Sequence, residues 1–344
     1  MAHNKQDTYL RLHKIMQDSL IPKVEIGGNR FVMISDLHLG NGSYWDNFRD
    51  NLKSLQSALI HYLENGYKLM LLGDIEELWQ FDLPTIAKRY KNRSYRYMKS
   101  YGKDRFYRVF GNHDIDWSTF VDPVLKNPQK IHHAHEALKL VDSNGNVRVL
   151  MLHGHQGSTE SDKFSWLSRI AVKDFKLVEP LAKAVGLYGH TSATKSQIAT
   201  DYEQIMYAWA KENNIILICG HSHRAIFASI SYAMKLNEKL RQAQLEANTV
   251  IDNKEEYKKK RKIVEKLLDE LMDETKKGRD IDPSAGDKNT LPCYFNDGCG
   301  LYTYGITNLE IDGDNIRLIK WDNDGKQTVF EKGLLSEYIQ KVDG

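Results

Sequence analysis

The sequence predicts an α/β fold, because short apolar runs of strand type alternate with segments of helical periodicity. The strand-like runs lie at residues 31–34, 69–72, 149–152 and 215–219. Between the first two, leucines recur at helical spacing over residues 48–65, just before Gly66. Strands that alternate with helices are typical of a sheet covered by helices.

Three further segments are expected to be helical. Residues 5–20 carry a modest helical pattern that ends at Pro22. Residues 156–214 exceed the length of a simple crossover and are interpreted as a helical insertion or lid. Residues 231–280 are interpreted as a second helical excursion with two amphipathic helices. We expect all of these segments to belong to a single domain over residues 1–344.

The C-terminal part returns to strand-type sequence. Residues 301–306, 309–311 and 316–321 are rich in β-branched and aromatic side chains, which predicts three strands. Asp312 to Asn315 form a turn signal between the last two, so we expect a hairpin that completes a sheet.

Composition limits the function classes. Lys and Arg total 48 against 46 Asp and Glu, so no global field marks a nucleic-acid binder. The three cysteines, Cys219, Cys293 and Cys299, are too few for a disulfide framework and form no Cys-x-x-Cys zinc pattern. No signal-peptide pattern or transmembrane-length apolar run occurs. We therefore expect a cytoplasmic protein with reduced thiols.

Carboxylates and histidines follow the predicted strands. Asp36 and His38 come directly after the first run, and on an extended chain this spacing points both side chains the same way. Asp74 follows the second run, and its two oxygens can bridge a pair of cations. The pattern predicts a metal site at the strand ends.

Four more residues offer metal-ligating atoms. Asn112 supplies an amide oxygen, and His153, His221 and His223 supply imidazole nitrogens. A mixed nitrogen and oxygen set without thiolate favours Mn, Fe or Zn over Ca or Mg. Each motif alone also fits a helix cap, a turn or a surface histidine pair. Their joint occurrence, in this order and at strand ends, favours one metal site.

The motif series Asp-x-His, Gly-Asp, Gly-Asn-His-Asp, His and Gly-His-x-His resembles that of the calcineurin-like metallophosphoesterase superfamily over residues 31–224. This resemblance implies a four-layer α/β/β/α sandwich with inserted helical segments. It also implies a dinuclear site with two divalent ions, for which we expect Mn, with Fe or Zn as alternatives. The implied reaction is attack on phosphorus by a hydroxide that bridges the two ions.

The resemblance also implies roles for individual residues. It assigns one ion to Asp36, His38, Asp74 and His223, and the other to Asp74, Asn112, His153 and His221. His113 is expected to be catalytic, either protonating the leaving oxygen or stabilising a phosphoryl oxygen. Asp114 is expected to orient or charge-stabilise that imidazole.

Residues 73–79 are similar to the Gly-Asp-x-x-Glu-x-Trp stretch of bacterial UDP-diacylglucosamine pyrophosphohydrolases. This chain departs from that group at His113, where the group has Arg, and at His155, where it has Asp. The likeness makes Glu77, Trp79 and His155 candidate substrate-binding residues. It also implies an apolar acyl-binding face within residues 164–172, which fit core packing as well.

The sequence therefore predicts a metallophosphoesterase that hydrolyses a phosphomonoester, phosphodiester or pyrophosphate. Its expected partner is a phosphorylated small molecule or a lipid-linked substrate, and the alternative of a nucleotide-sugar lipid pyrophosphohydrolase stays open. A nuclease of the same fold is another alternative, because residues 90–108 are rich in Lys, Arg and Tyr. Nucleic acid is not the favoured partner, because a surface helix explains this composition. A non-catalytic metal-binding scaffold is disfavoured by the complete motif set, and the oligomeric state is left open.

Overall fold

The computed structural model describes residues 5–118, 134–157, 197–251, 253–275 and 290–344. Most of the predicted insertion over residues 156–214, including the candidate acyl-binding residues 164–172, lies outside the described residues.

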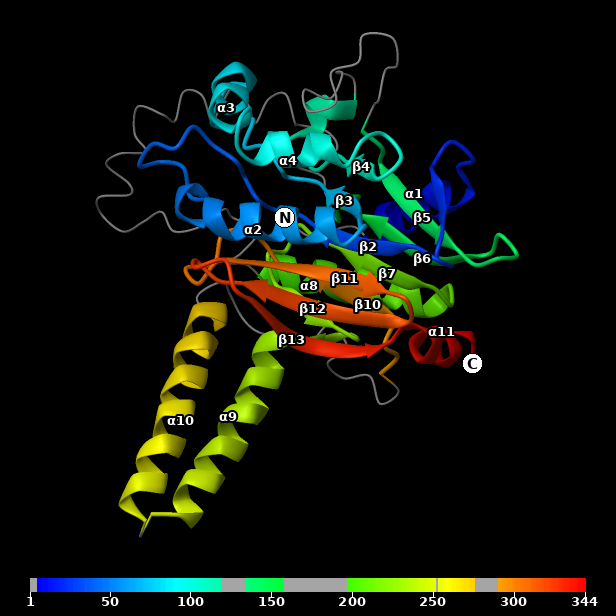
Figure 1. Ribbon diagram of the computed structural model, residues 1–344. Coiled ribbons are helices and arrows are strands. Elements are labelled where there is room, and N and C mark those ends of the chain that lie inside the picture. The colour runs from blue at the N-terminus through cyan, green and yellow to red at the C-terminus, as the bar shows by residue number, and fades with distance from the viewer. Residues whose placement is uncertain (1–4, 119–133, 158–196, 252, 276–289) are drawn as a thin grey trace.

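Two mixed β-sheets form the centre of the fold (Figure 1). The strand order of the first is β13 (Gln327–Leu334), β12 (Asn315–Trp321), β11 (Ile306–Asp312), β2 (Arg30–Ile34), β3 (Lys68–Leu72) and β4 (Phe106–Val109). The strand order of the second is β1 (Lys23–Glu25), β5 (Ala137–Val141), β6 (Val147–Leu152), β7 (Ile216–Cys219), β10 (Tyr294–Asp297), β8 (Ala225–Phe227) and β9 (Ile230–Ser231). Strands β2, β3 and β4 run parallel to one another, as do β6, β7 and β10.

The inner strands β11, β2 and β3 of the first sheet are buried on both faces, because they alternate apolar side chains between two cores. In β2, Phe31 and Met33 join the core shared with the second sheet, whereas Val32 and Ile34 join the core beneath the helices. Those helices are α2 (Leu52–Glu64), α3 (Leu83–Tyr90) and α4 (Ser94–Ser100). On the second sheet, α8 (Gln197–Glu212) packs against β7 and β10, and α1 (Lys5–Gln17) packs beside α8. This layering confirms the predicted four-layer α/β/β/α sandwich.

Two long helices project from the sandwich as a hairpin (Figure 1). They are α9 (Tyr232–Thr249) and α10 (Lys254–Thr275), and they lie where the sequence predicts two amphipathic helices. Within the described residues, no helix combines the length and the apolar composition needed to cross a bilayer.

The C-terminal strands differ in part from the prediction. The hairpin of β11 and β12 is confirmed, with Asp312 paired to Asn315 across the turn. The strand predicted over residues 301–306 is wrong, because most of this segment is a loop in which Gly305 has a φ of +121°. Tyr302 is buried in that loop, and its hydroxyl donates to the carbonyl oxygen of His223. The aromatic residues that resemble a strand therefore support the loop next to the candidate site. The chain ends in α11 (Leu335–Asp343).

Candidate metal centre

The predicted motifs lie in the loops that follow β2, β3, β4, β6 and β7. Because the carboxyl ends of parallel strands meet at one edge of a sheet, these loops are brought together there. Backbone hydrogen bonds connect the first two loops: the amide of Asp36 donates to the carbonyl of Gly73, and that of His38 donates to Asp74. The backbones of these two loops are thus held against each other.

One group of donor atoms comprises Asp36, His38 and His223, all buried. The Nε2 atom of His223 lies 3.0 Å from Asp36 Oδ1 and 3.0 Å from His38 Nε2. Asp36 Oδ1 accepts no hydrogen bond from a described residue. Two imidazole nitrogens and a buried carboxylate oxygen that converge in this way fit a divalent cation.

A second group comprises Asp74, His153 and His221. His153 Nε2 lies 3.1 Å from Asp74 Oδ2 and 3.2 Å from the amide oxygen of Asn112. Asp74 Oδ2 also lies 3.9 Å from His38 Nε2, so this carboxylate stands between the two groups. The two groups contain residues of the two ligand sets that the sequence resemblance implies, and a third group, His38, Glu77 and His113, lies beside them.

The loops hold these side chains in unusual backbone conformations. Five of the eight non-glycine residues with positive φ in the described chain are Asp36, His38, Asp74, His221 and His223. A left-handed backbone at such residues costs roughly 1–3 kcal/mol each and is concentrated at functional sites. The sequence argument placed Asp36 and His38 on an extended segment, and this is wrong, because their φ values are 51° and 48°. They still converge because both residues turn out of the strand.

Two motif glycines are required by close approach rather than by flexibility alone. A Cβ atom on Gly73, whose φ is +91°, would overlap the ring of His153. A Cβ atom on Gly111 would overlap the carboxylate of Asp74. Any side chain at these two positions would displace a donor atom of the second group.

The carboxylate of Glu77 contacts two histidines, which differs from the substrate-binding position that the sequence predicts. The sequence interpretation assigns it to substrate binding, but its buried carboxylate lies between two imidazoles. It is 2.7 Å from Nδ1 of His38 and 2.8 Å from Nδ1 of His113. These are hydrogen-bond distances, and a carboxylate behind a ligating histidine fixes the orientation of its ring. Glu77 thus positions both a candidate ligand and the candidate catalytic histidine.

His113 is held on a second side by Trp79. The indole stacks on the imidazole, with ring centroids 3.9 Å apart and planes 20° apart. The indole Nε1 donates to the carbonyl of Asn112 at 3.0 Å. Asp114 does not orient the imidazole as expected, because its carboxylate accepts hydrogen bonds from the backbone amides of Gly111 and Ile75. Glu77 takes the role that the sequence argument gave to Asp114.

His155 belongs to neither group of donors. Its buried ring lies beside His153, with centroids 5.5 Å apart, and beside Phe110, with centroids 6.0 Å apart. Burial and the neighbouring His153 lower the pKa of His155 to about 3, so its ring is neutral at physiological pH.

Some supporting residues had no clear signal in the sequence. The hydroxyl of Ser35 lies between the carboxyl groups of Asp36 and Asp297. Asn296, at the end of β10, donates to the carbonyl of Gly220 at 2.6 Å. The loop after β7 is therefore supported by a strand that sequence patterning missed.

The pKa values of several residues in the site are strongly shifted by burial and by neighbouring charges. Burial alone would raise the pKa values of Asp36 and Asp74, but facing imidazoles, chiefly of His223 and His153 respectively, hold both well below the usual range. Burial opposes the proton on His153, yet Asp74 and Asp36 raise its pKa to about 9. Burial and nearby carboxylates, Asp74 first, raise the pKa of Asp114 to about 7. Strongly shifted and opposed pKa values are typical of functional sites.

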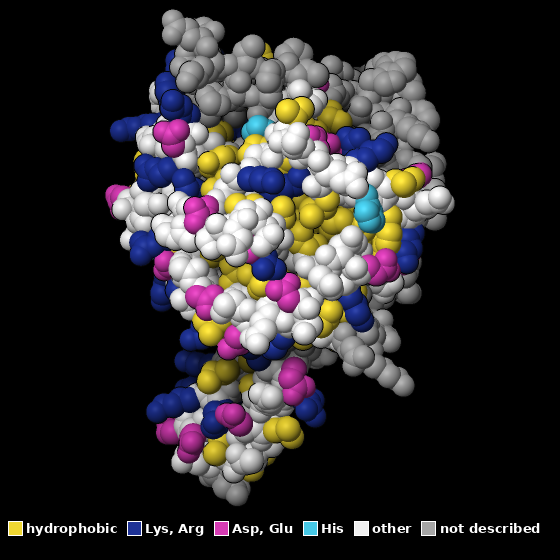
Figure 2. All heavy atoms as spheres, turned by 90° about the vertical axis from the view of Figure 1, so that its right-hand side faces the viewer, with side chains coloured by type: hydrophobic (Ala, Val, Ile, Leu, Met, Phe, Trp, Pro, Cys, Tyr) yellow, Lys and Arg dark blue, Asp and Glu magenta, His cyan; other side chains and the backbone are white. Residues whose placement is uncertain are grey.

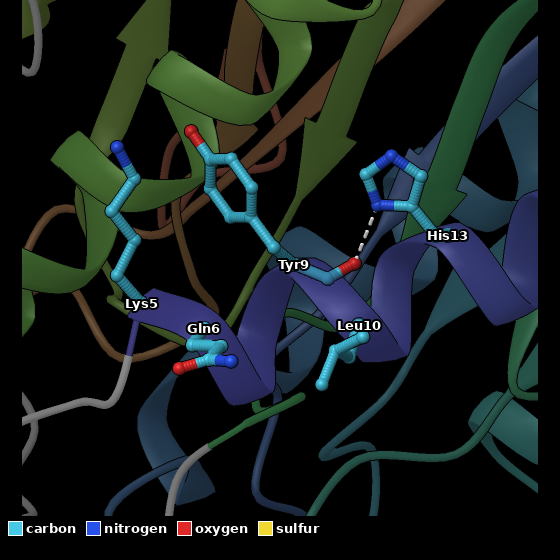
Figure 3. A pocket seen from close by; sticks show the side chains of 5 residues that line it. All are labelled: Lys5, Gln6, Tyr9, Leu10 and His13. Carbon is cyan, nitrogen blue, oxygen red and sulfur yellow. Dashed lines mark hydrogen bonds between the residues drawn. The ribbon is translucent and has the colours of Figure 1, made fainter.

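A hollow beside α1 is separate from this centre. Lys5, Gln6, Tyr9, Leu10 and His13 line it (Figure 3). None of these residues belongs to the donor groups, and His13 Nδ1 contacts the backbone oxygen of Tyr9. We therefore place the site at the strand ends.

The sandwich and the paired donor groups define a metal-dependent phosphoesterase. A sequence model of the family described as calcineurin-like phosphoesterase matches residues 29–225, more than half of the chain. The chain belongs to this family and is a metallophosphoesterase, a hydrolase of phosphate esters that uses divalent metal ions. No curated protein matches the chain.

The position of Glu77 makes a prediction for Glu77→Gln. A glutamine has one acceptor oxygen, so one of the two imidazole Nδ1–H groups would face an amide NH₂ instead. We expect turnover to fall by roughly 10–100-fold with the protein folded. Steady-state kinetics and thermal unfolding would measure this, with Glu64→Gln on the exposed end of α2 as the matched control. Full turnover in Glu77→Gln would show that neither imidazole depends on this carboxylate.

Proposed function

We propose that the chain binds two divalent ions and hydrolyses a phosphomonoester, phosphodiester or pyrophosphate. Asp36, His38 and His223 would hold one ion, and His153, His221 and Asn112 would hold the other, with Asp74 shared between them. The observation that carries this proposal is the place of Asp74 Oδ2, which lies 3.1 Å from His153 Nε2 and 3.9 Å from His38 Nε2. A carboxylate between two sets of imidazoles is the arrangement that a pair of adjacent cations requires.

The donor set supports Mn as the resident metal, with Fe or Zn as alternatives. It combines carboxylate and amide oxygens with imidazole nitrogens, and it contains no thiolate. Bound ions would activate a water molecule for attack and offset the charge on the phosphoryl oxygens. Because the pKa values of Asp36 and Asp74 lie well below their usual range, both carboxylates stay ionised at neutral pH.

Residues of the protein would supply the proton and hold the proton donor in a fixed orientation. His113, His38 and Glu77 form a third cluster of donor atoms. We assign His113 to the reaction rather than to an ion, because Glu77 and Trp79 fix the orientation of its ring from two sides. An imidazole held in this way can protonate the leaving oxygen or donate a hydrogen bond to a phosphoryl oxygen. Asp114 supports the step indirectly, because it ties the loop that contains His113 to the loop after β3.

A nucleotide-sugar lipid pyrophosphate is a second candidate substrate. The residues that carry the likeness to UDP-diacylglucosamine pyrophosphohydrolases, Glu77 and Trp79, both contact His113. A panel of p-nitrophenyl phosphate, bis-p-nitrophenyl phosphate, UDP-sugars and UDP-diacylglucosamine, assayed with Mn-loaded protein, separates the candidates. Metal-loaded protein that cleaves none of these would contradict the proposed function.

The nuclease alternative loses part of its support. Tyr90, Tyr95 and Tyr101, in the basic stretch around α4, are buried in the core under the helices. They therefore provide no platform on which exposed bases could stack.

Metal binding should release protons at neutral pH. In the metal-free protein the pKa of His153 is about 9, so this ring is protonated near neutrality and must lose its proton to ligate an ion. The apparent affinity for Mn is therefore expected to rise with pH between about 6.5 and 9. Calorimetric titrations in buffers of different ionisation enthalpy would count the released protons. A buffer-independent enthalpy and a flat affinity over this range would contradict the ligand role of His153.

We also propose that the protein acts in the cytoplasm as one catalytic domain. The three cysteines are buried and form no disulfide with one another, which fits a reducing compartment.

A further inference from the structure

One surface of the molecule carries an excess of positive charge. Between residues 88 and 105, which include the end of α3 and all of α4, eight of the nine charged side chains are basic. Six of these are exposed, and together they define the α3–α4 basic surface: Lys88, Lys91, Arg93, Arg96, Lys99 and Lys103. None of the six forms an ion pair with a described residue. Within the described residues, the positive charge of this surface is therefore not offset by ion pairs.

Elsewhere, basic side chains are mixed with acidic ones. Figure 2 shows Lys and Arg interspersed with Asp and Glu over the face that it draws, and the α9–α10 hairpin at its lower end carries both signs. In that hairpin, Lys260 pairs with Glu246 at 2.8 Å and Arg261 pairs with Glu265 at 3.0 Å. The basic run over residues 258–262 is therefore partly neutralised, unlike the α3–α4 basic surface.

The α3–α4 basic surface adjoins the loops of the candidate metal centre. A Cβ atom on Gly42 would overlap the guanidinium of Arg89, and a Cβ atom on Gly40 would overlap the ring of Phe81, so α3 and its preceding turn pack on the loop after His38. This loop also presents Tyr44, whose side chain is 69% exposed. The guanidinium of Arg49 lies 5.4 Å from the centre of the Tyr44 ring. Basic and aromatic side chains thus occur together beside the site.

We propose that the α3–α4 basic surface binds the anionic headgroups of a lipid bilayer. Unpaired lysines and arginines attract anionic lipids, and an exposed aromatic ring suits the interface between headgroups and water. A protein partner fits less well, because lysine is depleted in protein interfaces. Nucleic acid also fits less well, because Tyr90, Tyr95 and Tyr101 of this segment are buried. Binding would bring the loops of the site close to phosphate esters held in the membrane, whichever ester the enzyme cleaves.

Vesicle sedimentation tests this inference directly. The full-length, Mn-loaded protein is mixed with phosphatidylcholine vesicles, with and without phosphatidylglycerol. We expect binding only to the anionic vesicles, and release at high salt. The variant Lys88→Glu/Lys91→Glu/Lys99→Glu should bind them at least about tenfold more weakly. All three positions are exposed, so thermal unfolding should be little changed.

A matched control makes the same charge change at the hairpin, far from α3 and α4 in Figure 1. This control, Lys258→Glu/Lys259→Glu/Lys262→Glu, should retain vesicle binding. Equal loss in both variants, or no binding of the unchanged protein to anionic vesicles, would overturn the proposal. So would loss of duplex DNA binding, but not of vesicle binding, in the α3–α4 variant. Hydrolysis of a water-soluble aryl phosphate should be unchanged in both variants, which separates this result from any failure of the proposed chemistry.

Discussion

Asp74→Asn is expected to abolish binding of at least one metal ion and to lower phosphoesterase turnover on the order of 10³-fold or more. Asp74 is buried and contacts His153, and its Oδ2 atom also faces His38 across the centre. Asparagine keeps the shape but removes the negative charge that two adjacent cations share. One amide oxygen cannot replace two carboxylate oxygens as a bridge.

Metal content by mass spectrometry and turnover with added Mn would measure this effect together. Asp324→Asn is a suitable control, because the Asp324 side chain is 96% exposed and lies only in a surface ion pair with Lys53. A variant at Asp74 that keeps two ions and normal turnover would show that this carboxylate is not shared between them. Retained metal without turnover would place Asp74 in the chemistry but not in metal binding.

The sequence predicted the parts of the fold that repeat a simple pattern. Apolar runs mark β2, β3, β6 and β7 because parallel strands covered on both faces are apolar along their length. Short strands such as β1 and β8 carry too few residues for a pattern and were missed. The aromatic loop before β11 was mistaken for a strand, because side-chain type alone does not reveal the turn at Gly305.

The candidate site, like the fold, could be predicted from the sequence only in part. The residues of the two donor groups occur in recognisable motifs, so the sequence alone predicts them as candidate ligands. The partner of His113 was not identifiable in this way, because Glu77 and Asp114 are both carboxylates near the motif. Only the fold decides that Asp114 points to backbone amides and Glu77 points to the imidazole. Sequence spacing therefore indicates which kinds of side chain are present, whereas the direction of each side chain depends on the loop residues whose φ is positive.

His113→Gln is expected to lower turnover by about 10²–10⁴-fold while metal content stays close to that of the unchanged protein. His113 shares a third cluster of donor atoms with His38 and Glu77 but is not one of the residues proposed to hold the ions, and Glu77 and Trp79 hold its ring. If the imidazole protonates the leaving oxygen, the loss should be large for alkyl phosphate esters. It should be small for p-nitrophenyl esters, whose leaving group needs no proton. If it instead stabilises a phosphoryl oxygen, both ester classes should lose activity equally.

The comparison of the two ester classes therefore assigns the role of His113, and the metal analysis tests its place outside the ligand sets. His61→Gln provides a matched control, because His61 lies on α2 just before β3, at the opposite end of that strand from the site. Loss of metal ions together with turnover would make His113 a ligand or a support of one, since its partner Glu77 also holds His38. Unchanged turnover on both ester classes would remove His113 from the reaction and leave the proton to solvent.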